Sequence, residues 1–458
     1  MQPHPVPLRI LHISTRLILG GSQENTVLSC EGQARLGHRV HLAFGPIYGP
    51  EGSLLARIER FNLRCRAGEE RTESGGEVCP IVTHTVPHLV REVSLSADRR
   101  CSRELRDLIS RLSPDIVHTH SSKAGILGRC AAHAVLARAT PHAFRVGRAS
   151  PRIIHTIHGP PFMPVEGPPM KRLKTRLTNY AYTLAERYAA RRCDAIVSVA
   201  DAMTRLFRSR RIGRPSQYIT VYSGMETDTF LHAPPGEDRD ATRADLGLAP
   251  DDLVIGTVAR LAEHKGHDDL LDALADDLKA NPSWKLLWVG DGWWRGRLID
   301  KARALGLSVH EADAAPPPTG PRLAGASPPA TAAQVVLTGL VPPEAVPPLI
   351  RAMDVLAHPS YREGLPRTVP QALLCGVCPV ATDVDGAGEV CRDMETGRLV
   401  PPADPTRLRE AVRWCAENPV ARQALAVRGR AECAERFSAR RMVADLEKVY
   451  AGVPVGPR

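Results

Sequence analysis

Aromatic side chains are scarce in this chain, at 4% of the residues. A surface that stacks nucleic-acid bases needs exposed Phe, Tyr or Trp along a basic groove, so we expect no nucleic-acid partner. The sequence also lacks a run of about 20 uncharged apolar residues, the length that a helix needs to cross a bilayer. Its start, MQPHPVPLRILHIS, has no basic region followed by a long apolar stretch. We therefore predict no signal peptide and a cytoplasmic protein.

The eleven cysteines show no pairing pattern. An odd number scattered over a long chain suits reduced thiols better than a disulfide framework. Cys375 and Cys378 form a single CxxC, and no second ligand pair has the spacing of a structural zinc site. The DVD at 383–385 could suggest Mg²⁺ or Mn²⁺, but we interpret it as part of a glycine-rich turn. The sequence therefore predicts no metal site.

The chain does have a clear excess of positive charge and enough length for two or three domains. Its 458 residues carry a formal net charge of +10. Such a balance favours anionic partners, which include nucleotides, phosphorylated substrates and acidic membrane faces. Charge alone does not choose among them.

Short apolar runs of strand length alternate with helical patterns along the chain, which predicts an α/β fold. Buried parallel strands read as continuous apolar runs because helices cover both faces of their sheet. A helix is predicted from Gln23 to Leu36. Strands are predicted at 8–14, 38–44, 115–120, 152–158 and 195–200, and in a second series at 253–260, 284–292, 334–339, 354–360 and 378–383.

A Pro- and Gly-rich stretch separates the two series of strands, so we predict two Rossmann-like domains. The first covers 1–225 and the second covers 226–436. A C-terminal helix and tail at 437–458 is expected to pack back across the domain junction. Three segments interrupt the pattern and are interpreted as mobile surface insertions, at 64–80, 138–150 and 312–333.

Two cations follow the first strand of the second series. Arg260 stands at the end of that strand and Lys265 follows five residues later. Ligands of open α/β sheets bind at the carboxyl ends of the strands, where two cations can neutralise a diphosphate as it leaves. A pair of solvated surface charges is the alternative.

Glycines and polar residues follow two later strands of the same series. Gly290 begins a turn that permits close approach of a ligand to the backbone, although a plain strand-to-helix turn explains it equally well. Glu363 lies in a loop before a helix that contains Gln371. Glu363 can accept hydrogen bonds from sugar hydroxyls and Gln371 can bond a ribose; a carboxylate that stabilises the helix start is the alternative for Glu363.

The first half offers a glycine loop and several histidines. Gly20 and Gly21 lie between the first strand and the first helix, where backbone N–H groups can approach a phosphate. His158 closes a strand. His118 and His120 also close a strand, two residues apart and so on one face, and are interpreted as core or supporting residues.

These segments together resemble a known family. The second half contains GTVARLAEHKG, VGDGWWRGRL, LTGLVPP and HPSYREGLPRTVPQALLCG in this order. The first half contains TRLILGGSQENT, PDIVHTHSSKAG, IHTIHG, CDAIVSVADAM and VYSGMETDTF. In order and spacing, this set resembles the retaining glycosyltransferases of family 4, which have the GT-B fold of two Rossmann-like domains facing across a cleft.

The resemblance implies roles for individual residues. It implies that the second domain binds a nucleotide sugar, that the first binds the acceptor, and that catalysis takes place in the cleft. Arg260 and Lys265 match the diphosphate-binding pair, and His158 matches a cleft histidine that bonds the donor sugar. Glu363 matches the first acid of the E-x7-E motif, and Gln371 stands where the second acid contacts ribose. The donor loop around Glu363 also includes Gly364 and Leu365.

The resemblance predicts a retaining, metal-independent transfer of a sugar from a nucleotide sugar, expected to be UDP-linked, to a hydroxyl of a glycan or lipid-linked acceptor. A nucleotide-sugar epimerase of the same fold and a non-catalytic anion- or membrane-binding relative are the alternatives. Basic residues cluster at 170–176, 186–192 and 205–214. A solvated helix face is their usual explanation, and peripheral contact with an anionic membrane at the inner face of the cytoplasmic membrane is the alternative.

Overall fold

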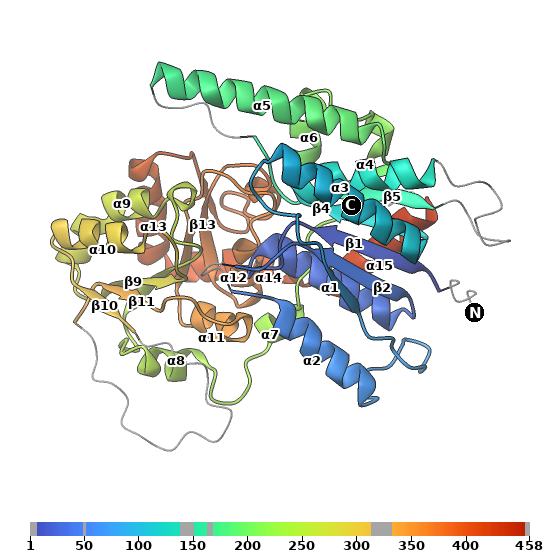
Figure 1. Ribbon diagram of the computed structural model, residues 1–458. Coiled ribbons are helices and arrows are strands. Elements are labelled where there is room, and N and C mark those ends of the chain that lie inside the picture. The colour runs from blue at the N-terminus through green and yellow to red at the C-terminus, as the bar shows by residue number, and fades with distance from the viewer. Residues whose placement is uncertain (1–6, 49–51, 138–150, 163–167, 313–331, 454–458) are drawn as a thin grey trace. The chain divides into compact units, whose positions relative to one another are not determined.

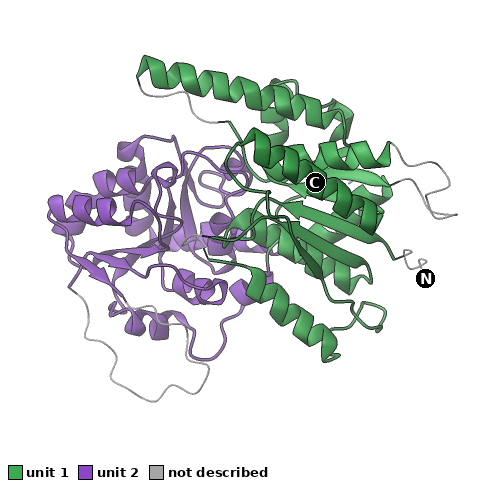
Figure 2. Cartoon of the chain, viewed as in Figure 1, with its two compact units in different colours: residues 1–225, 439–458 green, residues 226–438 purple. Residues whose placement is uncertain are grey.

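The computed structural model describes residues 7–48, 52–137, 151–162, 168–312 and 332–453. The chain divides into two compact units (Figure 2), unit 1 with residues 1–225 and 439–458 and unit 2 with residues 226–438. The segment predicted as an insertion at 138–150, and all but the ends of the one at 312–333, lie outside the described residues.

Unit 1 is built on a seven-stranded sheet in the order β3-β2-β1-β4-β5-β6-β7. Every neighbouring pair is parallel. Its strands are β1 Arg9–Ser14, β2 Arg39–Phe44, β3 Val82–Thr85, β4 Ile116–His120, β5 Arg152–Ile157, β6 Ala195–Ser198 and β7 Tyr218–Thr220. Its helices are α1 Gly21–Arg35, α2 Leu55–Arg66, α3 Leu95–Leu112, α4 Ser122–Leu136, α5 Pro169–Ala190, α6 Asp201–Ser209 and α15 Ala439–Ala451.

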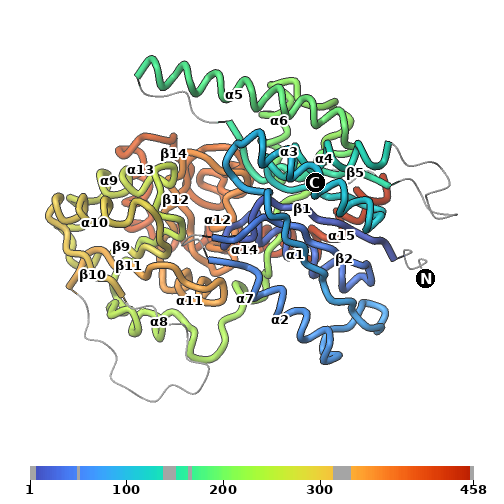
Figure 3. The backbone as a smooth tube through the Cα atoms, viewed as in Figure 1, coloured from blue at the N-terminus to red at the C-terminus, as the bar shows by residue number. Residues whose placement is uncertain are grey.

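The central strand β4 buries all of its residues, as expected for a strand covered by helices on both sides. The last helix, α15, belongs to the same unit. Figure 3 shows it in red beside the blue α1. Its buried residues Met442, Val443, Leu446 and Val449 join Ile10 and Leu28 in one hydrophobic core. The tail that the sequence set apart is thus part of unit 1.

Unit 2 repeats this design (Figure 1) with a parallel seven-stranded sheet in the order β10-β11-β9-β8-β12-β13-β14. Its strands are β8 Leu253–Val258, β9 Trp284–Val289, β10 Val309–Glu311, β11 Val335–Leu337, β12 Val355–His358, β13 Cys378–Thr382 and β14 Arg398–Val400. Its helices are α7 Thr227–Leu231, α8 Arg239–Asp245, α9 His267–Ala280, α10 Arg295–Ala304, α11 Val346–Arg351, α12 Thr368–Leu374, α13 Pro405–Glu417 and α14 Pro419–Arg436. The predicted α/β fold with two Rossmann-like sheets is confirmed.

The segment at 64–80 differs from its prediction as a mobile insertion. Its first three residues complete α2. Glu70 pairs with Arg35 at 2.8 Å, and Val78 is buried in the core beside α1 and β2. An ion pair and a buried apolar side chain hold this segment against unit 1, and a count of its polar residues could not reveal either contact.

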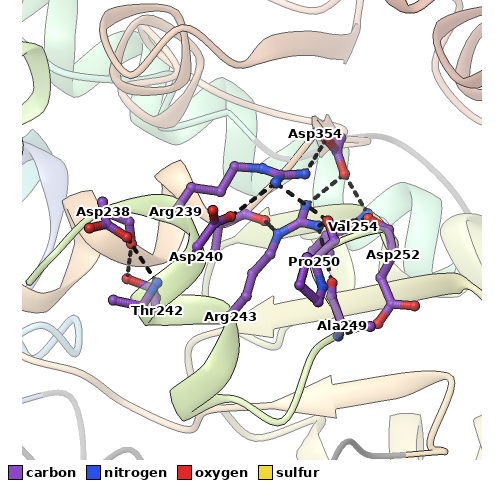
Figure 4. Close-up of polar contacts among 12 residues, drawn as sticks. Asp238, Arg239, Asp240, Thr242, Arg243, Ala249, Pro250, Asp252, Val254 and Asp354 are labelled. Atoms are coloured by element: carbon purple, nitrogen blue, oxygen red, sulfur yellow. Dashed lines mark hydrogen bonds and ion pairs between the residues drawn. The ribbon is translucent and has the colours of Figure 1, made fainter.

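A buried arginine ties the start of unit 2 to its sheet (Figure 4). Arg243 of α8 donates to the carbonyl oxygens of Ala352, Pro250 and Asp252 at 2.8–2.9 Å and to Asp354 Oδ2 at 2.7 Å. The same Asp354 oxygen accepts the backbone N–H of Val254 at 2.9 Å. One guanidinium therefore satisfies several backbone groups at the amino-terminal ends of β8 and β12.

Candidate active site

Two loops of unit 2 meet at the carboxyl ends of the neighbouring strands β8 and β12. Gly266 has a φ of +70°, and a Cβ at this position would lie 1.9 Å from the carbonyl oxygen of Pro359. Only glycine allows this approach without strain. The backbone N–H of Tyr361 donates to the carbonyl of His264 at 2.9 Å, which fixes one loop to the other. The loops that carry Lys265 and Glu363 are thereby held together.

A cation, a carboxylate and an imidazole converge where these loops meet. Lys265 Nζ lies 2.5 Å from Glu363 Oε1, and His358 Nε2 lies 2.9 Å from the same oxygen. The Nδ1 atom of His358 is 3.1 Å from Thr368 Oγ1. Little of these three side chains is exposed, with 17% for Lys265, 12% for Glu363 and 4% for His358. The structure thus brings together two of the predicted catalytic residues.

The electrostatics of this cluster keep Glu363 ionised. Burial by itself raises the pKa of a carboxyl, but the charge of Lys265 and the bond from His358 outweigh it, and the pKa of Glu363 falls well below its usual range. The backbone N–H of Glu363 donates to Asp385 Oδ2 at 2.7 Å, and burial raises the pKa of Asp385. A fixed carboxylate in this position can accept hydrogen bonds from hydroxyl groups.

Two members of this cluster were not predicted from the sequence. His358 is the last residue of β12, and Asp385 follows β13 with a φ of +49°. A histidine that directly ends a buried strand, five residues before the predicted acid, is the signal that could have found His358. No spacing in the sequence places Asp385 beside Glu363.

The other residues predicted in unit 2 lie in the same group of loops and the helix after them. Arg260 follows β8 and is half-buried. Gly364 accepts the backbone N–H of Gly386 at 3.0 Å, and Leu365 is buried. Gln371 is a buried residue of α12. Their contacts with a nucleotide sugar stay predictions.

The glycines after β9 have a structural reason of their own. Gly290 has a φ of +138°, and a Cβ there would lie 2.2 Å from the carbonyl oxygen of Ala259. A Cβ on Gly292 would lie 2.3 Å from the carbonyl oxygen of Leu261. The close approach of the loop after β8 therefore explains why both positions are glycine. A role of Gly290 in ligand binding stays a prediction.

In unit 1, the predicted residues lie after β1 and β5. Gly20 has an extended backbone with a φ of −175°, which any residue adopts, and Gly21 begins α1. A Cβ on Gly20 would meet only the flexible end of the Gln23 side chain, at 2.8 Å. His158 follows β5, and its Nε2 lies 3.0 Å from His120 Nδ1.

The chain was compared with protein families and known proteins. Residues 19–229 match the family model described as Glycosyltransferase Family 4, and residues 252–418 match the one described as Glycosyl transferases group 1. EpsD of Bacillus subtilis, which is named as a glycosyltransferase, is 24% identical over 350 residues, 76% of this chain and 79% of that protein.

Two further relatives are named with their substrates or ligands. The UDP-Gal:alpha-D-GlcNAc-diphosphoundecaprenol alpha-1,3-galactosyltransferase of Escherichia coli is 23% identical over 317 residues, 69% of this chain and 70% of that protein. The crystal structure of Anabaena Alr3699/HepE in complex with UDP and glucose matches with a TM-score of 0.70 and 18% identity, and covers 97% of this chain and 100% of the other. At this identity the structural match speaks for the fold alone.

Proposed function

Since this chain is a glycosyltransferase of family 4 with the GT-B fold, we propose that it transfers a sugar from a UDP-sugar to a hydroxyl of a glycan or lipid-linked acceptor, with retention of configuration. The observation that carries this proposal is the cluster of Lys265, Glu363 and His358 at the carboxyl ends of β8 and β12. Open α/β sheets bind their ligands at this edge. The UDP-sugar and the lipid-linked acceptor are supported by the galactosyltransferase of Escherichia coli, whose name includes UDP-Gal and a diphosphoundecaprenol acceptor.

The reaction follows from the charges of the cluster. The bond between the anomeric carbon and the diphosphate breaks, and the cationic Lys265 and Arg260 stabilise the departing diphosphate without a metal ion. The acceptor oxygen bonds the anomeric carbon on the face that the phosphate leaves, and its proton passes to the phosphate oxygen. Glu363 accepts hydrogen bonds from the sugar, while Lys265 and His358 both bind its Oε1 and hold the carboxylate in place.

We assign the contact with the nucleoside part of the donor to Gln371. A neutral amide can bond a ribose hydroxyl but lacks the charge of the acid that the family motif has there, which weakens the contact by about 1 kcal/mol. We therefore propose a ribose contact weaker than the usual one. The two cations that bind the diphosphate, Arg260 and Lys265, then contribute the larger part of the affinity for the nucleotide.

Titration of the chain with UDP by calorimetry tests this proposal. We expect UDP to bind equally well in EDTA and in magnesium, because the phosphates are neutralised by side chains. At a hundredfold excess over Kd, UDP should raise the free energy of unfolding by about 2.7 kcal/mol. GDP and ADP serve as matched controls. Binding only with magnesium, or tighter binding of GDP or ADP, would contradict the proposed donor and its metal independence.

We further propose that α5 of unit 1 contacts an anionic membrane. A row of large apolar side chains on this helix is exposed, at positions spaced three or four residues apart, and we name it the apolar stripe. Such spacing puts the side chains on one side of a helix. Its members and their exposed fractions are Met170 77%, Leu173 51%, Leu177 61%, Tyr180 62%, Leu184 45% and Tyr188 54%.

The opposite side of α5 packs against the rest of unit 1. Its Glu186 is 1% exposed and pairs with Arg129 of α4 at 2.6 Å. Beside the stripe, the first two turns carry four exposed cations, Lys171, Arg172, Lys174 and Arg176. A helix with an apolar side and adjacent cations lies in the interface of an anionic bilayer. Among the described helices, none has the length and apolar character of a membrane span.

Sedimentation with lipid vesicles tests this contact. The chain is expected to sediment with phosphatidylglycerol vesicles at low salt and not with phosphatidylcholine vesicles. Replacing Leu173 and Leu177 with serine should weaken binding at least tenfold, since a buried leucine contributes about 1.5–3 kcal/mol. Leu63→Ser on α2, where the leucine is 61% exposed, is the matched control. Equal binding of both variants would show that α5 does not touch the lipid.

A further inference from the structure

An exposed tryptophan lies in the loop after β9, at the carboxyl edge of the unit 2 sheet. Trp293 is 79% exposed, whereas the neighbouring Trp294 packs against the core and has the guanidinium carbon of Arg297 4.2 Å from its ring centroid. Leu340, in the loop after the adjacent strand β11, is 47% exposed. Packing of the core therefore accounts for Trp294 and gives no reason for the aromatic ring of Trp293.

Backbone hydrogen bonds place Trp293 next to the loop that carries the two cations of the proposed donor site. The N–H of Leu261 donates to the carbonyl of Asp291 at 3.1 Å, and the N–H of Trp294 donates to the carbonyl of Leu261 at 3.1 Å. The loop after β9 thus runs alongside Leu261, which directly follows Arg260 in the chain. The exposed indole and the cations therefore lie on adjoining loops at one edge of the sheet.

The loop after β11 is joined to the same place. The N–H of Gly290 donates to the carbonyl of Gly339 at 3.0 Å, and the N–H of Thr338 donates to the carbonyl of Trp288 at 3.0 Å. Gly339 directly precedes Leu340. Since β9 lies between β8 and β11, and neighbouring strands are about 4.8 Å apart, β11 lies within about 10 Å of β8. Both exposed apolar side chains therefore follow strands close to the one that the cations follow.

A nucleoside diphosphate held by these cations has a base that only a ribose separates from the phosphates. The base therefore has to lie over loops near the one after β8. On the side of β12 the edge carries polar groups, where Glu363 is ionised and its backbone N–H bonds Asp385. On the side of β9 and β11 it carries Trp293 and Leu340. The faces of a base stack on aromatic rings, so the side of β9 and β11 suits the base better.

We propose that the loops after β9 and β11 form the base subsite of the donor, in which Trp293 stacks on the base and Leu340 contacts the same ring. This inference rests on the proposed function, because it takes the ligand of the two cations to be UDP or a UDP-sugar. The base takes no part in the reaction, so the stacking is equal in the bound donor and in the transition state. Trp293 thus contributes to donor affinity and not to the rate of the bound complex.

Calorimetric titration of Trp293→Leu tests this subsite, because leucine keeps an apolar side chain and removes the aromatic ring. We expect the Kd for UDP to rise about tenfold, within the range that one stacked base contributes. The Kd for inorganic pyrophosphate, which has no base, should stay native. Trp293→Phe keeps a ring and should restore most of the UDP affinity. Val420→Ser on α14, where the valine is 84% exposed, is the matched control and should bind UDP as the native chain does.

Steady-state kinetics with a UDP-sugar separate this role from a purely structural one. An interaction that is equal in the ground state and the transition state changes KM and leaves kcat unchanged. We therefore expect Trp293→Leu to raise KM about tenfold at a native kcat. An unchanged KM, or equal losses of UDP and pyrophosphate binding, would overturn the base subsite.

Failure of this inference and failure of the proposed function give different results. A native chain that binds no UDP overturns both. Equal binding of UDP by the native chain and by Trp293→Leu overturns the base subsite alone and leaves the proposed donor in place. A lower free energy of unfolding in Trp293→Leu together with native UDP affinity would show that the indole packs within the chain, and would likewise overturn the subsite.

Discussion

Lys265→Ala is expected to lower kcat of sugar transfer by roughly a hundredfold to a thousandfold, the usual effect of removing one preorganised group that stabilises developing charge. The ammonium of Lys265 lies 2.5 Å from Glu363 and is the cation of the cluster at the edge of the sheet. Without it, the departing diphosphate loses a fixed positive charge. The measurement is UDP release from a UDP-sugar, compared between the variant and the native chain.

The same substitution affects Glu363, because it removes one of the two groups that hold the pKa of this carboxyl down and leaves His358 as the other. A carboxyl that takes up a proton in the working pH range accepts fewer hydrogen bonds from the sugar. We therefore expect kcat of Lys265→Ala to rise with pH where that of the native chain is flat. The direction follows because deprotonation restores the acceptor.

Lys279→Ala is the matched control for this experiment. Lys279 lies near the end of α9, pairs with Asp276 at 2.9 Å and is 45% exposed, so it carries the same charge away from the cluster. Its removal should leave kcat unchanged. A Lys265→Ala variant that transfers sugar at the native rate and melts at the native temperature would show that the leaving diphosphate is stabilised elsewhere.

The strands that the sequence predicted are those in which continuous burial forces an apolar run. The predicted ranges at 115–120 and 253–260 contain β4 and β8, because side chains of a doubly covered sheet have no solvent-facing side. The strands that were missed are short and lie at or near sheet edges. Val82–Thr85 has one apolar residue followed by three polar ones and is mostly exposed, so its sequence resembles that of a loop.

Residues of the site could be predicted from the sequence only where the residue type and its position after a strand indicate the role. Lys265 and Glu363 were found because a cation and a carboxylate that each follow a buried apolar run point to the same sheet edge. Asp385 was missed because its contact with Glu363 depends on a left-handed residue after β13. The hydrogen bonds that join Gln33, His12, His120 and Tyr450 were missed for a similar reason, since these residues of α1, β1, β4 and α15 are brought together only by the folded sheet. Contacts that depend on strand register or on a turn between distant segments leave no local pattern in the sequence.

Arg243→Met is expected to lower the free energy of unfolding of unit 2 by about 3–5 kcal/mol, the range for breaking a buried ion pair from one side. The Arg243 side chain is 1% exposed. Its loss leaves Asp354 with weaker partners and leaves the carbonyls of Ala352 and Asp252 without this donor. A buried polar group that loses its hydrogen bond costs more than the bond contributed.

Urea unfolding followed by tryptophan fluorescence measures this effect in the right unit. All five tryptophans lie between residues 284 and 414, within unit 2, so their signal reports unit 2 alone. Arg239→Met is the matched control. Arg239 bonds the same Asp354 at 3.2 Å but is 42% exposed, and an exposed ion pair contributes about 0–1 kcal/mol. Equal midpoints for the two variants would show that burial of Arg243 adds nothing.

This effect should be confined to stability. Arg243 acts at the amino-terminal ends of β8 and β12, where it bonds Asp252 and Asp354. Lys265 and Glu363 follow the carboxyl ends of the same strands. The folded fraction of Arg243→Met should therefore keep a native kcat per active site, whereas the folded fraction of Lys265→Ala should not. If Arg243→Met lost kcat and Lys265→Ala kept it, Arg243 and the cluster of Lys265, Glu363 and His358 would have been assigned the wrong roles.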